Sequence, residues 1–271
     1  MKKKILIQTD NLCLSFPSAS GKLQILNSVN FSLYENETVA LVGPSGSGKS
    51  SLLMLLGGLE ESDTGSIMIA GQDITKLSED GLANLRKKTM GIVFQSFHLI
   101  PTITALDNVC IPLELAGHSN IKNRAIEILT EVGLGKRLNH FPSQLSGGEQ
   151  QRVAIARALA IKPLIILADE PTGNLDQKTG SKIIELLFKL NTKNKSSLVI
   201  VTHSTDLANK CQRQVKLENE FWTLVKSLSI MSPYLSINRL IIIKGPEAYN
   251  VKIGDIKNID IKINVNKTIP S

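Results

Sequence analysis

The chain has 271 residues, of which 42% are hydrophobic and 20% charged, and this balance excludes an intrinsically disordered protein. The net charge of +7 permits an anionic partner, yet no basic run exceeds Lys2 to Lys4 and no RNA-recognition aromatic motif occurs, so we expect proximity to an anionic membrane and no nucleic acid. No apolar run approaches the roughly 20 residues that cross a bilayer, and the N-terminal apolar stretch is too short for a signal peptide, which predicts a cytoplasmic chain.

The N-terminal part of the chain reads as strands and turns. Apolar alternation predicts strands over residues 5–8, 12–16, 23–29 and 30–34, with a turn through residues 17–21. An antiparallel hairpin region therefore precedes residue 38. Phe16 lies within it, and its ring can stack on a nucleotide base or pack in the core; the sequence leaves both interpretations open.

A glycine-rich loop follows, and it fits the pattern G-x-x-x-x-G-K-[ST]. It lies between an apolar strand (residues 38–42) and a helix-forming run (residues 51–56), which is the context that a phosphate-binding loop requires. Glycines let successive backbone N–H groups point at an anion, and the following helix adds its positive end. Lys49 would reach the β- and γ-phosphates, and the Ser50 hydroxyl would be a magnesium ligand. The loop consists of Gly43, Pro44, Ser45, Gly46, Ser47, Gly48, Lys49 and Ser50.

Beyond the loop helix, the pattern predicts a strand over residues 66–71, a polar helix over 78–88 and an apolar strand that ends in Gln95. A glutamine at the carboxyl end of such a strand can reach a bound metal or its water, although this signal is weak by itself. Residues 96–161 then become mainly helical, and their start (residues 97–101) is a candidate docking surface. One amphipathic helix there has its apolar face at Ala125, Ile128, Leu129 and Val132.

A second phosphate-binding helix end is predicted at Ser146. This residue is a good N-cap, and Glu149 stands at capping-box distance. Gly147 and Gly148 expose backbone donors at the positive end of the helix. One chain thus carries two phosphate-binding ends for one nucleotide.

Two carboxylates, Asp169 and Glu170, follow a continuous apolar strand over residues 164–168 that is typical of a parallel strand buried on both faces. Asp169 would hold magnesium through water, and Glu170 would orient and deprotonate the attacking water. They could be solvated loop residues, but the upstream phosphate loop favours the catalytic interpretation. A last apolar strand brings His203 to the same sheet edge, where it could bond the γ-phosphate.

Together these residues resemble the ATP-binding cassette (ABC) ATPases over about residues 3–219. The matching motifs are the Walker A loop (43–50), the Q-loop glutamine (Gln95), the signature (145–151), Walker B (164–169), the catalytic Glu170, the D-loop (174–176) and the switch histidine (His203). The resemblance implies an α/β fold, with a RecA-like P-loop NTPase core, an antiparallel β subdomain and an α-helical signature subdomain at about 96–161. The ATPase domain would span residues 3–220, with an atypical tail at 221–271.

The resemblance also implies how the site works. Two copies would pack head to tail, so that Ser146, Gly147 and Gly148 of one contact the nucleotide on the other. ATP and Mg²⁺ are the implied cofactors. The nucleotide would be contacted by Phe16, the Walker A residues, Ser51 and Asp176, and the metal by Ser50, Gln95 and Asp169, with Glu170, His203 and Gln95 as catalytic residues.

The implied partners are a second copy of the chain and an integral membrane permease, which places the chain at the inner face of the cytoplasmic membrane. Residues 91–101, 107–109 and 168–176 are similar to the lipoprotein-release and macrolide-export subgroup. The alternative is a soluble ABC ATPase that acts on ribosomes or DNA. Such proteins usually carry two cassettes or a long coiled coil, and this sequence has one cassette without sustained heptads.

Three departures from the family pattern stand out. Asn36 replaces a usual glycine, and we expect it to accept a left-handed turn. Ser204 stands where aspartate is common. The sequence lacks the glycine expected after Asn219, and residues 221–271 resemble nothing in the subgroup. This tail is either a small β appendage or sequence from outside the family, and we favour the second.

Overall fold

The structure, a computed structural model, describes residues 4–18, 21–217, 240–244 and 247–251. The chain divides into two units, one of Met1–Ser15 with Gln24–Leu217 and one of Phe16–Leu23 with Glu218–Ser271. In the second unit, β10 (Leu240–Lys244) pairs antiparallel with β11 (Glu247–Val251). Most of the predicted tail lies outside the described residues, so its origin stays a prediction.

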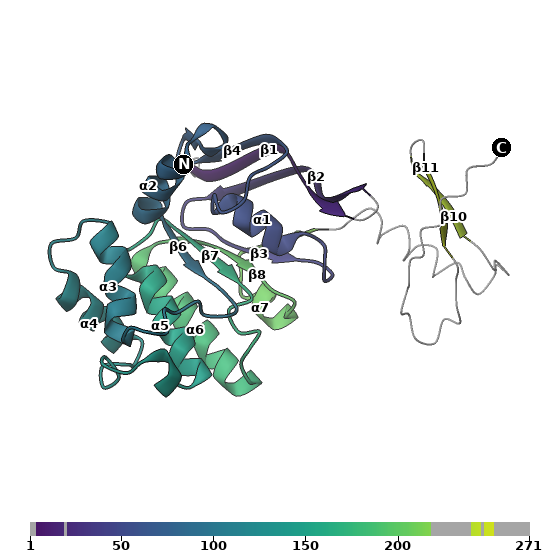
Figure 1. The fold of residues 1–271 in the computed structure, drawn as a ribbon. Coiled ribbons are helices and arrows are strands. Elements are labelled where there is room, and N and C mark those ends of the chain that lie inside the picture. Colours follow the sequence, from purple (N-terminus) through teal and green to yellow (C-terminus); the bar gives the residue numbers. More distant parts are fainter. Residues whose placement is uncertain (1–3, 19–20, 218–239, 245–246, 252–271) are drawn as a thin grey trace. The chain divides into compact units, whose positions relative to one another are not determined.

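A five-stranded parallel sheet is the centre of the first unit (Figure 1). Its strand order is β6-β7-β8-β3-β9, and every neighbouring pair is parallel. This confirms the α/β fold and the buried strands expected from the sequence. The strands are β3 (Thr38–Val42), β6 (Met90–Val93), β7 (Ile165–Asp169), β8 (Ser197–Val201) and β9 (Arg213–Lys216).

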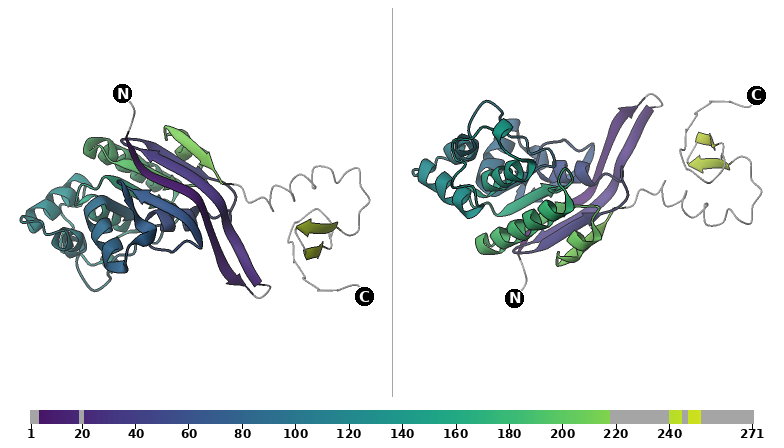
Figure 2. Two further views of the ribbon diagram at one scale, coloured as in Figure 1. Left: turned by 90° about the horizontal axis from the view of Figure 1, so that it is seen from above. Right: turned by 90° about the horizontal axis from the view of Figure 1, so that it is seen from below.

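Both faces of this sheet are buried, and alternate residues of each central strand enter different cores. In β7, Ile166 and Ala168 pack with the helices α3 (Ala105–Leu115), α4 (Ile121–Glu131), α5 (Gly147–Leu159) and α6 (Gln177–Asn194). Ile165 and Leu167 pack on the other face with α1 (Lys49–Leu56) and the antiparallel sheet. In Figure 1 the helices α3–α6 lie on one side of the parallel sheet and α1 on the other, and Figure 2 gives two further views of the same arrangement.

The antiparallel sheet has the order β2-β1-β4-β5. The expected short N-terminal strands are in fact two long ones, β1 (Ile5–Ser18) and β2 (Gly21–Tyr34), which are neighbours in this sheet. Strand β1 also pairs antiparallel with β4 (Thr64–Ile69), and β4 pairs with β5 (Gln72–Asp73). Asn11 and Ser28 have positive φ angles of 48° and 50°, and the β1–β4 register shifts between Asp10 and Cys13. At these irregularities the apolar side chains change to the other alternate positions of the strand. The sequence pattern therefore predicted separate short strands where the structure has continuous ones.

Helices occur in the predicted regions, and the end of one predicted strand needs a correction. The apolar face predicted for α4 is buried, with 0–3% exposure for its four residues. Helix α6 begins at Gln177, because Asp176 caps it by accepting a hydrogen bond from the Thr179 N–H at 3.0 Å. Strand β6 ends at Val93, so Gln95 lies in the loop beyond it. The remaining helices are η1 (Ile74–Lys76), α2 (Glu79–Thr89), η2 (Pro142–Gln144) and α7 (Thr205–Asn209).

Two of the departures have a local explanation. Asn36 has a φ of 58°, which confirms the left-handed turn, and the buried Glu37 beside it pairs with Arg213 of β9 at 2.8 Å. Ser204 is the N-cap of α7, where its hydroxyl accepts from the Leu207 N–H at 3.4 Å. Serine and aspartate are both good N-caps, so the exchange keeps the helix start. In the part of the chain that the structure describes, no helix has the length and apolar character needed to span a membrane.

Candidate functional site

The glycine-rich loop connects β3 to α1 at the carboxyl edge of the parallel sheet. Gly43, Gly46 and Gly48 have φ angles of 153°, 77° and 88°, a region that favours glycine. At Gly43 close packing adds a second requirement, because a Cβ there would lie 2.3 Å from the carbonyl oxygen of Leu217. The loop therefore has a backbone path that other residues would strain, as expected for an anion-binding nest.

Lys49 is buried, at 7% exposure, and its ammonium group bonds back to the start of the loop. Its Nζ donates to the carbonyl oxygens of Gly43 at 3.1 Å and Pro44 at 2.8 Å. The hydroxyl of Ser47 is also buried, and among the described residues it has no hydrogen-bond partner. A buried hydroxyl without a partner costs free energy, so the loop contains a polar atom that a phosphate oxygen would satisfy. These features fit a bound nucleotide.

Asp169 ends β7 beside the loop and accepts a hydrogen bond from the Ser50 hydroxyl at 3.0 Å. Burial raises the pKa of this carboxyl group, while the Ser50 hydroxyl lowers it. Carboxylate and hydroxyl oxygens are the hard donors that Mg²⁺ prefers. The pair therefore fits the ion.

Glu170 and His203 meet at the same sheet edge, as the sequence predicts for residues that follow adjacent parallel strands. The His203 Nδ1 lies 3.0 Å from the Glu170 Oε2, and the Glu170 N–H donates to the Val201 carbonyl at 3.1 Å. Glu170 has a φ of 40°, an uncommon angle for a residue with a side chain. Such strain often marks functional positions, and here it accompanies a carboxylate held by a histidine.

The signature residues lie on a different set of elements. Ser146 caps α5 in a capping box with Glu149, whose Oε2 accepts from the Ser146 N–H at 2.9 Å. This N–H is the main reason why the pKa of Glu149 is lowered. Helix α5 packs against α3, α4, α6 and β6, whereas α1 packs against β7 and β8. The structure therefore brings together Lys49, Ser50, Asp169, Glu170 and His203, and it places the Ser146 helix end on another part of the fold.

The three remaining predicted nucleotide contacts have other surroundings. Phe16 is 38% exposed, so the core interpretation of this residue is wrong, and base stacking stays a prediction. Asp176 caps α6, and a hydrogen bond from the Thr179 hydroxyl lowers the pKa of its carboxyl group. Ser51 is half-buried on α1, directly after Ser50.

Sequence reasoning missed Arg157, which holds the segment after Gln95. This largely buried guanidinium, whose pKa burial lowers, donates to the carbonyl oxygens of Phe97 at 2.9 Å and His98 at 2.6 Å. Both of those residues have left-handed backbones, with φ angles of 60° and 47°. The candidate docking segment is thus tied to the signature helix α5. No local pattern indicated this, because the partners are about 60 residues apart in the sequence.

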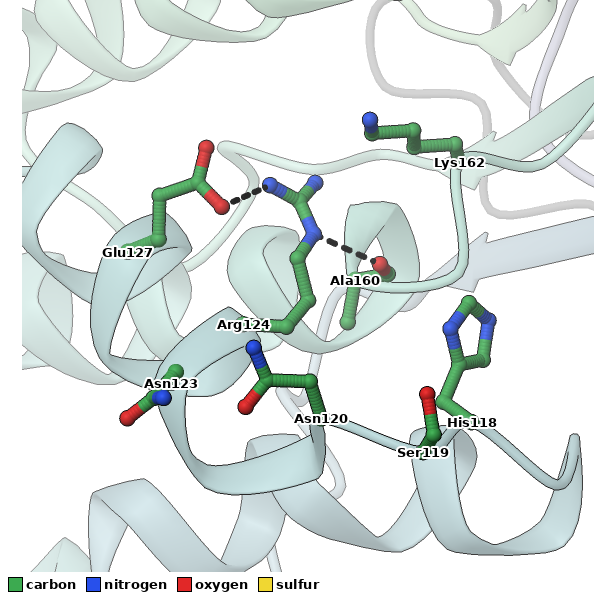
Figure 3. Close-up of a pocket in the computed structure, with 8 residues that line it drawn as sticks. All are labelled: His118, Ser119, Asn120, Asn123, Arg124, Glu127, Ala160 and Lys162. Atoms are coloured by element: carbon green, nitrogen blue, oxygen red, sulfur yellow. Dashed lines mark hydrogen bonds and ion pairs between the residues drawn. The ribbon is translucent and has the colours of Figure 1, made fainter.

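Sequence reasoning also missed a cavity of about 300 Å³ between α4 and the end of α5. Figure 3 shows Arg124 at its centre, with its Nε donating to the carbonyl oxygen of Ala160 at 3.1 Å and its guanidinium paired with Glu127 at 2.9 Å. The arginine thereby satisfies a carbonyl group at the C-terminal end of α5. We interpret it as a structural contact between the two helices. The cavity is lined by His118, Ser119, Asn120, Asn123, Arg124, Glu127, Ala160 and Lys162.

Comparisons with known proteins agree with this geometry. Residues 26–173 match the family model described as ABC transporter. The chain is 47% identical over 221 residues to the uncharacterized ABC transporter ATP-binding protein YbbA of Escherichia coli K12, covering 81% of this chain and 97% of that protein. The same figures hold for YbbA of Shigella flexneri.

Two solved structures are also similar. One is the dimeric post-hydrolysis state of the ATP-binding cassette MJ0796 bound to ADP and Pi, which is 41% identical, with a TM-score of 0.73 over 79% of this chain and 94% of that one. The other is the dimeric structure of MJ0796, a bacterial ABC transporter cassette, at 42% identity and a TM-score of 0.73, covering 78% and 94% of the two chains.

Proposed function

Because the chain belongs to the ABC transporter family as its ATP-binding, ATP-hydrolysing protein, we propose that it works as a head-to-tail homodimer that drives a separate membrane permease. The observation that carries this proposal is that the two phosphate-binding helix ends belong to helices packed on opposite faces of the parallel sheet. Helix α5 presents Ser146, Gly147 and Gly148 on elements other than those that hold the P-loop. A second copy can supply the missing contact, and the MJ0796 cassettes are dimers.

Within each site, we assign roles from the contacts described above. The P-loop N–H groups and Lys49 bind the phosphates, and Ser50 with Asp169 would hold Mg²⁺, together with Gln95. When bound, this ion neutralises phosphate charge and orients the reacting groups. Glu170 accepts the proton of the attacking water, and the His203 ring holds its carboxylate through the 3.0 Å contact.

We further propose that the chain associates with the inner face of the cytoplasmic membrane through its permease, in the manner of the lipoprotein-release and macrolide-export subgroup. The segment over residues 97–101 is the proposed docking surface, and its exposed Ile100 supports this. It also adjoins Gln95 and is bonded to α5, so a movement of the signature helix would reach the permease.

The experiment that tests the proposal uses Glu170→Gln, which removes the proton acceptor and keeps the shape of the side chain. With ATP and Mg²⁺ we expect this variant to form a stable dimer by size-exclusion chromatography with light scattering, while turnover is lost. Glu185→Gln, the same change at an exposed position of α6, is the matched control and should turn over normally.

The tagged Glu170→Gln dimer can then be isolated from detergent-solubilised cells with ATP and Mg²⁺, and its partners identified by mass spectrometry. Recovery of a permease with few membrane spans and a large extracytoplasmic domain is expected. Normal turnover by Glu170→Gln would remove this residue from its catalytic role. Recovery of ribosomes or DNA-bound proteins would contradict the transport function.

A further inference from the structure

The side-chain amide of Asn174 makes two hydrogen bonds with a single residue, Gln95. The Asn174 Nδ2 donates to the backbone carbonyl of Gln95 at 3.1 Å, and the Gln95 Nε2 donates to the Asn174 Oδ1 at 3.2 Å. Asn174 lies in the turn after Glu170, which is closed by a hydrogen bond from the Gly173 N–H to the Glu170 carbonyl at 2.9 Å. The metal-binding glutamine is therefore linked directly to the segment that carries the proposed general base.

Gly173 provides the space for this pairing. A Cβ at this position would lie 2.7 Å from the Gln95 Nε2 and 3.0 Å from its Cδ. The backbone of Gly173 is not in the left-handed region, so the requirement is steric and not conformational. The Gln95 side chain thus lies against the backbone of residue 173 and reaches Asn174 beside it.

The two hydrogen bonds determine which way the Gln95 amide faces. An amide has two ends of similar shape, but only the oxygen accepts hydrogen bonds or binds a cation. The Gln95 backbone carbonyl can only accept, so it must meet the nitrogen of Asn174. The Asn174 oxygen then faces the Gln95 side chain and must meet its nitrogen. The Gln95 Oε1 is the end that remains for another ligand.

We propose that Asn174 is a positioning residue that fixes the amide orientation of Gln95 and so leaves Oε1 available for Mg²⁺ or its bound water. This inference rests on the metal role assigned to Gln95 under the proposed function. Outer-sphere groups that orient a metal ligand commonly contribute to affinity without touching the ion. Asn174 would act in this way through Gln95.

The test compares Asn174→Ala in two backgrounds of the full chain, wild type and Gln95→Glu. A carboxylate has an oxygen at both ends, so a glutamate at this position needs no orienting partner. The measurement is the Mg²⁺ concentration that gives half-maximal binding of the non-hydrolysable analogue AMP-PNP, by isothermal titration calorimetry. In the wild-type background, Asn174→Ala should raise this concentration about three- to tenfold, as expected for loss of the one hydrogen bond that holds the Gln95 side-chain amide. In the Gln95→Glu background it should change nothing.

A second readout needs no nucleotide. In the ¹⁵N spectrum of the free protein, the side-chain NH₂ signal of Gln95, assigned by its loss in Gln95→Glu, should shift in Asn174→Ala. An equal rise in the Mg²⁺ requirement in both backgrounds would show that Asn174 only supports the turn, and no rise in either would also overturn the inference. If wild-type binding of AMP-PNP were independent of Mg²⁺, the metal assignment of the proposed function would fail instead.

Discussion

Substitution of Gly91 by alanine tests how closely the signature helix must approach the sheet. Gly91 lies in β6, and a Cβ added to it would be 2.2 Å from the carbonyl oxygen of Ala158 in α5. Real Cβ atoms essentially never approach closer than 3.0 Å, so the helix would have to move by about 0.8 Å or more. The obstacle is helix backbone and not a flexible side chain, so the cost should reach the upper end of the range for overpacking, about 3 kcal/mol.

This cost corresponds to a fall in Tm of about 6–12 °C, at about 2–4 °C per kcal/mol for a protein of this size class. Thermal unfolding followed by far-ultraviolet circular dichroism measures it. Gly57→Ala is the matched control, because its nearest contact would be an ordinary 3.4 Å and its φ is −83°. We expect the control to stay within about 2 °C of wild type, since the added methyl group would make only ordinary contacts and the backbone already has a helical angle. Equal Tm values for the two variants would refute the packing argument.

The pKa of Glu149 is lowered in the folded state, chiefly by the Ser146 N–H. The ionised Glu149 side chain therefore contributes its full stabilisation above the unfolded pKa of about 4.3, and this stabilisation is lost as pH falls through the lower folded pKa. The Tm difference between wild type and Glu149→Gln should therefore shrink between pH 6 and pH 3, as measured by thermal unfolding; a difference independent of pH would contradict this. At an ATP concentration of 100 times Kd, binding should stabilise the wild type by about 2.7 kcal/mol and raise its Tm. Lys49→Ala should abolish this rise in Tm, and a variant that keeps it would exclude Lys49 from ATP binding. Arg124→Ala should lower the free energy of unfolding by about 1–2 kcal/mol, because it removes the hydrogen bond to the end of α5 and one ion pair. Urea unfolding measures this change, and an unchanged midpoint would show that the contact does not stabilise the fold. Truncation after Glu220 should leave ATPase activity intact, and failure of the shortened chain to fold would show that the tail belongs to the domain.

The sequence was sufficient to predict which residues meet at the carboxyl edge of the parallel sheet. Asp169, Glu170 and His203 each follow an apolar strand, and parallel strands bring their carboxyl ends to one edge, so their meeting required only the strand pattern. The P-loop was likewise recognisable, because its glycines, its lysine and its flanking strand and helix are consecutive. In these cases the physical requirement is local and therefore visible in the sequence.

The contacts that hold these elements in place were not predictable in the same way. Two close approaches join segments that are distant in the sequence, one between Gly91 and Ala158 and one between Gly43 and Leu217. A single glycine in the sequence does not indicate which distant residue will pack against it. The pairing of Asn174 with Gln95 joins residues 79 positions apart. The prediction that β1 and β2 would each be broken into shorter strands was wrong for a related reason. A bulge and a turn both shift the alternation of apolar residues by one position, so the sequence pattern does not distinguish them.

The position of β3 in the sheet has a consequence for synthesis of the protein. Both neighbours of this strand, β8 and β9, come much later in the chain. At a translation rate of about 5–20 residues per second, the strand that leads into the P-loop waits roughly ten to thirty seconds for its partners. During this interval the apolar segment Thr38–Val42 has two unpaired edges, which is a hazard for aggregation. The nascent chain should therefore be prone to aggregation at this segment until β9 emerges.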